Sequence, residues 1–109
     1  MNSTTAPMVA PVFAGNDRFA IECEVLRLSA KVGTRMRAAR VAGRTVTLKV
    51  RFADFTTITR SRTLGEATDV TREIYATAGD LYTALGLQRA RIRLVGVRVS
   101  RIRMVLWAA

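Results

Sequence analysis

The 109-residue chain contains no histidine and a single cysteine, Cys23. The absence of histidine excludes Ser-His and Cys-His catalytic pairs and every His-ligated metal site. One cysteine can form neither an internal disulfide nor a thiolate zinc cluster, and a reducing cytoplasm, where we expect this protein, requires neither. The eight acidic residues are scattered along the chain and indicate no carboxylate pair. We therefore predict no catalytic residue, no metal site and no cofactor within this chain.

Long hydrophobic runs are also missing. No apolar stretch approaches the roughly 18 residues that span a bilayer, and the N-terminus lacks the basic start and long apolar segment of a signal peptide. We expect no membrane partner. Half of the residues are nevertheless hydrophobic, which is enough for the core of one domain. We expect residues 1–16 to be a flexible N-terminal segment that could supply an edge strand at 8–13, and residues 17–105 to form the domain.

Positive charge is what the sequence has in excess. Eighteen Lys and Arg residues against eight Asp and Glu give a formal net charge of +10, and sixteen of the eighteen are arginine. Residues 35–62 carry a net charge of +7 and residues 89–103 a net charge of +6, whereas the remainder of the chain carries −3. Arginine forms planar, two-pronged contacts with phosphate. A domain this basic is expected to bind a polyanion, and nucleic acid is the first candidate.

The hydrophobic spacing predicts two helices, at residues 17–42 and 69–85, because apolar residues recur there at steps of three and four. Gly43 and Gly86 follow these segments and are expected to take the left-handed conformation that ends a helix. The two predicted core stripes consist of Ile21, Val25, Leu28, Val32, Met36 and Ala39 in the first helix, and of Val70, Ile74, Ala78, Leu81 and Leu85 in the second.

Alternation of apolar and polar residues predicts strands at 44–52 and 56–64, and a longer strand at 90–104. In the last strand the alternation changes phase at Gly96, which predicts a β-bulge there. With a strand near the N-terminus the order is βαββαβ. We therefore predict the α+β class, with a four-stranded antiparallel sheet and two helices packed on one face.

The uncovered face of this sheet would carry Lys49 and Arg51 together with alternate arginines of the last strand. The fold is then expected to bring the two basic segments together as one surface.

The stretch GRTVTLKVRFADFTTITRSRTL, at residues 43–64, resembles the little-finger domain of bacterial Y-family translesion DNA polymerases of the DNA polymerase IV group. The segments TDVTREIYATAGDLYTAL, at 68–85, and RIRLVGVRVS, at 91–100, follow in the same order, so that the resemblance covers residues 17–102. It implies a non-catalytic DNA-binding domain. In this family the sheet lies in the major groove of the primer–template duplex and grips the backbone phosphates during error-prone repair of damaged DNA.

The resemblance assigns DNA contacts to nine residues, which are Lys49, Arg51, Thr59, Arg60, Ser61, Arg62, Thr63, Arg93 and Arg98. Alternate residues of a strand project to one side about 6–7 Å apart, which is close to the spacing of phosphates along a nucleic-acid strand. Arg60 and Arg62 are therefore expected to take one phosphate each. Phe52 and Phe55 are expected in the core rather than stacked on bases.

The catalytic palm of the family, with its metal-binding carboxylates, has no counterpart in these residues. We therefore expect the chain to be an excised domain or the product of a truncated or split gene. It is expected to be no enzyme on its own but a fragment of a DNA-directed DNA polymerase, whose complete form would use magnesium. The expected partners are duplex DNA, the polymerase core and the sliding clamp.

Two alternatives remain. The chain could be a protein-interaction module that contacts the sliding clamp or other replication proteins, although the ending RMVLWAA does not supply the clamp-binding peptide of the family. An RNA-binding βαββαβ domain is disfavoured, because the central strands lack the aromatic pair on which such sheets stack bases.

Overall fold

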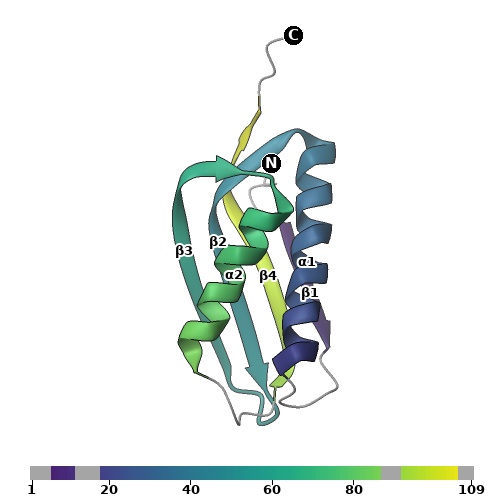
Figure 1. Cartoon of the computed structure of the whole chain (residues 1–109), viewed down its shortest axis with the longest axis vertical. Coiled ribbons are helices and arrows are strands. Elements are labelled where there is room, and N and C mark those ends of the chain that lie inside the picture. Colours follow the sequence, from purple (N-terminus) through teal and green to yellow (C-terminus); the bar gives the residue numbers. More distant parts are fainter. Residues whose placement is uncertain (1–5, 12–17, 87–91, 106–109) are drawn as a thin grey trace.

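The chain folds into two layers, an antiparallel sheet and two helices that both lie on one of its faces (Figure 1). The structure, a computed structural model, describes residues 6–11, 18–86 and 92–105. The strands are β1 (Ala6–Pro11), β2 (Val41–Phe52), β3 (Thr57–Thr68) and β4 (Ile92–Met104), and the helices are α1 (Arg18–Ala39) and α2 (Thr71–Leu85). The predicted α+β class, with two helices over an antiparallel sheet, is confirmed.

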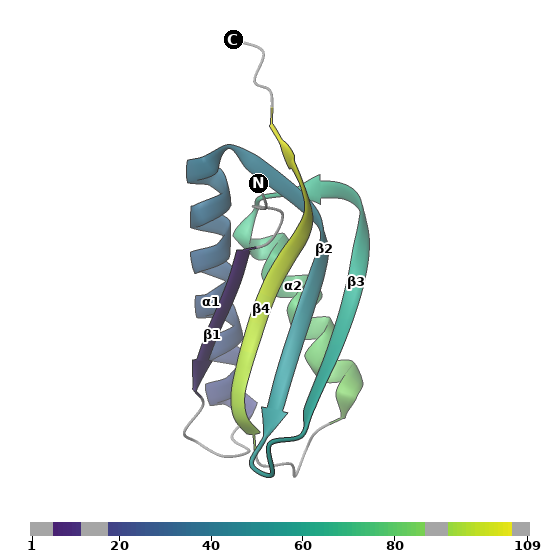
Figure 2. The same ribbon diagram turned by 180° about the vertical axis from the view of Figure 1, so that it is seen from behind.

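The sheet has the strand order β1-β4-β2-β3, in which every neighbouring pair is antiparallel. Each helix lies in a crossover connection between two strands that are not neighbours. Helix α1 connects β1 to β2 across β4, and α2 connects β3 to β4 across β2. Seen from behind, the sheet lies in front of both helices (Figure 2). The face of the sheet that points away from the helices is therefore covered by no described helix or strand.

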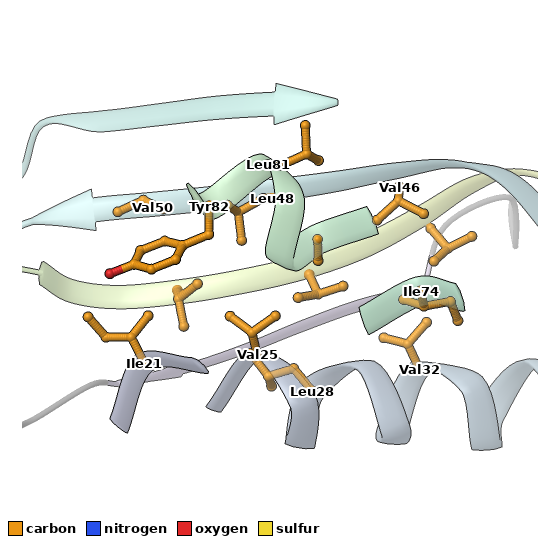
Figure 3. Packing of buried hydrophobic residues seen from close by; sticks show 14 of the residues in the cluster. Ile21, Val25, Leu28, Val32, Val46, Leu48, Val50, Ile74, Leu81 and Tyr82 are labelled. Carbon is orange, nitrogen blue, oxygen red and sulfur yellow. The ribbon is translucent and has the colours of Figure 1, made fainter. Parts of the chain in front are cut away.

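The core lies between the central strands and the two helices (Figure 3). Alternate residues of β2 pair with alternate residues of β4, and all of them are buried: Val46 with Val99, Leu48 with Val97, and Val50 with Val95. Five predicted residues of α1 and three of α2 pack against them, namely Ile21, Val25, Leu28, Val32, Met36, Ile74, Ala78 and Leu81. The predicted stripes are confirmed except at their ends, where Ala39 is exposed and Val70 precedes α2.

Gly43 does not end α1. The helix stops at Ala39, and Arg40 takes the left-handed conformation with φ 59°, while Gly43 lies within β2. A Cβ atom at Gly43 would lie 2.5 Å from Val99 Cγ1 and 2.8 Å from the Ser100 carbonyl oxygen. The glycine is therefore required by the close approach of β4. Gly86, with φ 64°, ends α2 as predicted.

The irregularity in β4 lies at Arg93 and not at Gly96. Gly96 pairs with Lys49 in an unbroken register, whereas the register shifts between Arg51, which pairs with Leu94, and Phe52, which pairs with Ile92. The predicted bulge at Gly96 is therefore wrong. Arg93 is the extra residue, and it allows both Ile92 and the later valines of β4 to be buried.

The close approach at Gly43 predicts a stability effect. Gly43→Ala should lower the free energy of unfolding by about 1–3 kcal/mol, because a methyl group must displace the β4 backbone or Val99. Gly65→Ala is the matched control, since a Cβ atom there meets nothing within 4 Å. Urea denaturation of both variants measures the difference. Equal stability of the two would contradict this account of Gly43.

Candidate nucleic-acid interface

The uncovered face of β4, β2 and β3, which we call the open face, is polar and basic. Directly opposite residues of antiparallel strands share a face, and residues between the buried ones point the other way. The open face therefore consists of four cross-strand rows, ordered β4, β2, β3: Leu94, Arg51, Thr57; Gly96, Lys49, Thr59; Arg98, Thr47, Ser61; and Ser100, Thr45, Thr63. Six of the nine predicted site residues are among these twelve: Lys49, Arg51, Thr59, Ser61, Thr63 and Arg98.

Hydroxyl groups join β2 to β3 across the open face. Thr45 Oγ1 lies 3.1 Å from Thr63 Oγ1, and Thr47 Oγ1 lies 2.9 Å from Ser61 Oγ. A hydroxyl group can accept one hydrogen bond while it donates another. The exposed members of these pairs, Ser61 and Thr63, can therefore hydrogen-bond an external phosphate oxygen while they keep a contact within the sheet.

Three cationic side chains lie among these hydroxyls. Arg51 Nε donates to Thr57 Oγ1 at 3.0 Å, so its guanidinium is already oriented along the face. Lys49 and Arg98 make no side-chain hydrogen bond or ion pair with any described residue. Glu66 is the only acidic residue in β2, β3 and β4 as the structure describes them. The open face is therefore a surface of positive potential with two unengaged cations.

Arg60 and Arg62 lie on the other side of the sheet. Arg60 is opposite Leu48 and Arg62 is opposite Val46, so both project toward the helix layer. Arg62 lies 3.5 Å from the Asp80 carboxylate of α2, and Arg60 donates to the neighbouring Thr59 carbonyl oxygen at 3.0 Å. Both are exposed because β3 lies at an edge of the sheet.

The expectation that both basic segments share one uncovered face is therefore wrong for these two arginines. The reason is the register of β3 against β2, which pairs Arg60 with Leu48 and Arg62 with Val46. Both arginines therefore share the face of the sheet that points toward the helices.

Arg93 occupies the end of the sheet. Its guanidinium carbon lies 4.4 Å from the centroid of the Phe55 ring, which is a cation–π contact. Phe55 is 61% exposed, so its predicted place in the core is wrong, whereas Phe52 is half-buried and packs against the core as expected. The sequence pattern gave no signal for the exposed ring.

Phe55 lies in the tight turn that connects β2 and β3. The Phe55 amide donates to the Phe52 carbonyl and the Phe52 amide donates to the Thr56 carbonyl, each at 2.8 Å. The Thr56 amide donates to Asp54 Oδ1 at 3.0 Å, and this contact lowers the pKa of the exposed Asp54 carboxyl below its usual value. These contacts hold Phe55 at φ 71°.

The residues that the structure describes contain no group of three His, Cys, Asp or Glu side chains that could hold a metal ion. No helix among them is long and apolar enough to cross a membrane.

Two helices on one face of an antiparallel sheet, opposite a basic and hydroxyl-rich face, define a small α+β domain with one covered and one open face. Comparison with known proteins makes this specific. The profile of the impB/mucB/samB family C-terminal domain matches residues 13–105, and the chain belongs to this family.

Curated relatives agree. The chain is 37% identical over 82 residues to DNA polymerase IV of Streptococcus pyogenes serotype M5 (strain Manfredo), a match that covers 75% of this chain and 22% of that protein. DNA polymerase IV of the serotype M28 strain MGAS6180 is 35% identical over the same length. The chain thus spans about a fifth of the length of these relatives.

Solved structures share the fold. A Y-family DNA polymerase chimera superposes with a TM-score of 0.81 at 13% identity, covering 95% of this chain and 30% of that one. The little finger domain of PolIV, in a complex with the beta-clamp processivity factor, superposes with a TM-score of 0.62 at 17% identity. This match covers 97% of the present chain and 90% of the PolIV domain. The predicted relation to the little-finger domain of Y-family polymerases, in the DNA polymerase IV group, is confirmed.

Proposed function

We propose that this domain binds duplex DNA through its backbone phosphates, as the non-catalytic grip of a translesion polymerase that acts in the cytoplasm. The open face carries the proposal, because it combines Lys49, Arg51 and Arg98 with aligned hydroxyl groups and no described acid among its four rows. Lysine and arginine neutralise phosphates, and hydroxyl groups add uncharged contacts. Nucleotidyl transfer would belong to the polymerase core, which would supply magnesium and its carboxylate ligands.

The geometry of the open face suits a phosphate backbone. Successive open-face residues of one strand lie about 6–7 Å apart, and neighbouring strands lie about 4.8 Å apart. Lys49 and Arg98 come from adjacent rows of adjacent strands, so they can contact different phosphates. Contacts of this kind fix the position of a duplex without reading its bases. A grip that does not read bases tolerates a damaged template.

The edge strand β3 extends this surface in a second direction. Thr59, Ser61 and Thr63 point to the open face, while Arg60 and Arg62 emerge on the helix side of the same strand. A phosphate strand that follows the free edge of β3 can therefore be contacted from both sides. All nine predicted residues remain in the proposal, with Arg60 and Arg62 reaching the backbone around the edge and Arg93 reaching it from the sheet end.

Removal of the open-face cations should weaken binding in a salt-dependent manner. About six phosphate contacts correspond to a slope of log K against log[salt] near −5, and each of Lys49→Ala, Arg51→Ala and Arg98→Ala should reduce its magnitude by about 0.9. Arg72→Ala on α2 removes the same charge from the helix layer and should leave the slope unchanged. Fluorescence anisotropy of a labelled duplex over a salt series measures this. Salt-independent binding, or an equal effect of Arg72→Ala, would refute the proposed face.

The edge arginines generate a separate prediction. The double variant Arg60→Ala, Arg62→Ala should weaken binding to all duplex sequences by the same factor, because phosphate contacts carry no sequence information. The double variant Lys31→Ala, Arg35→Ala removes two charges from the exposed side of α1 and serves as the control. Competition between duplexes of different sequence distinguishes the outcomes. Loss of affinity for one sequence alone would mean that the edge reads bases.

Clamp binding is the second candidate function, and the match to a PolIV little finger solved with a clamp favours it. At a salt concentration that abolishes DNA binding, a bacterial sliding clamp should still retain this domain on a column. Lys49→Ala, combined with Arg98→Ala, should leave that retention intact, since clamp contacts need not use the open face. If the clamp retains the domain at no salt concentration, this candidate fails and the DNA-binding proposal is unaffected.

A further inference from the structure

We propose that the tip of the β2–β3 turn is a stacking site for an unpaired nucleobase, formed by the ring of Phe55 with Arg93 against it. The site lies at the end of the open face, beyond the row that contains Arg51, in the turn at the lower end of Figure 2. The inference rests on the proposed DNA binding and adds a ligand class to it, namely a base that is not paired within the duplex.

The backbone at Phe55 is the first argument. A φ of 71° lies in the left-handed region, which glycine and asparagine adopt readily and which a bulky side chain rarely does. Three hydrogen bonds of the turn, made by Phe52, Phe55 and Asp54 with their neighbours, hold the residue there. The turn thus keeps an aromatic side chain at a position where glycine would be less strained.

The exposure of the ring is the second argument. Phe55 is 61% exposed and is not part of the core cluster, so hydrophobic burial does not explain its presence. Other exposed large hydrophobic residues, such as Phe19 and Met104, lie on a helix or at a strand end with ordinary backbone angles. A strained backbone and an exposed ring at one residue point to a ligand rather than to folding.

Arg93 supplies the third argument. The register shift in β4 makes Arg93 the extra residue and turns its guanidinium onto the Phe55 ring at 4.4 Å. One ring face is thereby covered by a planar cation, and the exposed remainder is open to solvent. A base that stacks on the open side completes a layer of guanidinium, ring and base, while the positive charge lies near the phosphates that flank the base.

The arrangement predicts the type of nucleic acid. A base inside a duplex is stacked on both faces, so away from a duplex end the site can be filled only by a base in a single-stranded extension or a base turned out of the helix. Stacking is tolerant of sequence, because every base has a π-face. The domain should therefore prefer a duplex that carries a single-stranded extension over a blunt duplex, with little preference among the four bases.

The decisive experiment compares two duplexes that carry the same short single-stranded extension, one with normal nucleotides and one with abasic nucleotides. Both have the same phosphates, so their difference isolates the bases. The unaltered domain should bind the base-containing extension about tenfold more tightly. Phe55→Ala and Phe55→Leu should abolish this difference in affinity, whereas Phe55→Trp should keep it because an aromatic ring remains. Phe19→Ala, which removes an exposed ring from α1, should also keep it.

Two further readouts separate the alternatives. Phe55→Gly should leave the melting temperature unchanged or raise it, because the strain is relieved, whereas a marked fall would show that the ring is structural. The tenfold preference should persist as salt rises, since both duplexes release the same counterions. Salt-dependent duplex binding with no preference for bases would overturn this inference alone. Absence of duplex binding would overturn the proposed function itself.

Discussion

The register of β2 between its two neighbours is the constraint on which the rest of the molecule depends. Side chains alternate along a strand, so a shift of one residue would exchange the two faces. In the observed register Val46, Leu48 and Val50 meet the helices, and Thr47 and Lys49 face outward. Full burial of a valine or leucine contributes about 1.5–3 kcal/mol, while an exposed ion pair such as Arg62–Asp80 contributes at most about 1 kcal/mol. Burial of the apolar residues therefore sets the register, and the position of the open-face cations follows from it.

The net charge of +10 does not measure the binding surface, because several arginines are engaged within the fold. Arg37 donates to the Asp69 carbonyl oxygen at 2.6 Å and thereby ties the end of α1 to the start of α2. Arg44 Nε donates to the Leu64 carbonyl oxygen at 3.1 Å. Such contacts satisfy backbone oxygens that would otherwise need water. Unengaged cations are the better guide to a polyanion site, and Lys49 and Arg98 are two of them on the open face.

Local pattern was sufficient to predict the two helices, the central strands and most of the core, because burial follows the periods of helix and strand. Local pattern gives the wrong prediction where a contact between residues far apart in the sequence determines the role or the face of a residue. The sequence pattern predicts a helix end at Gly43, but β4 approaches this residue so closely that only glycine fits. The face of Arg60 depends on how the turn sets β3 against β2, and the phase change in β4 arises at Arg93 rather than at the nearby glycine. Phe55 looked like a core residue because composition does not reveal which ring a turn holds in solvent.

The free edge of β3 links stability to the proposed binding. An edge strand presents unpaired backbone groups that can recruit a strand from another molecule, and charged side chains oppose such pairing. Arg60 and Arg62 provide that charge on one side of β3, and the exposed Ser61 and Thr63 keep the other side polar. Another strand would have to bury these charges, whereas a phosphate backbone neutralises them and leaves them partly hydrated. The features that prevent this edge from pairing with protein are thus the same features that suit it to DNA.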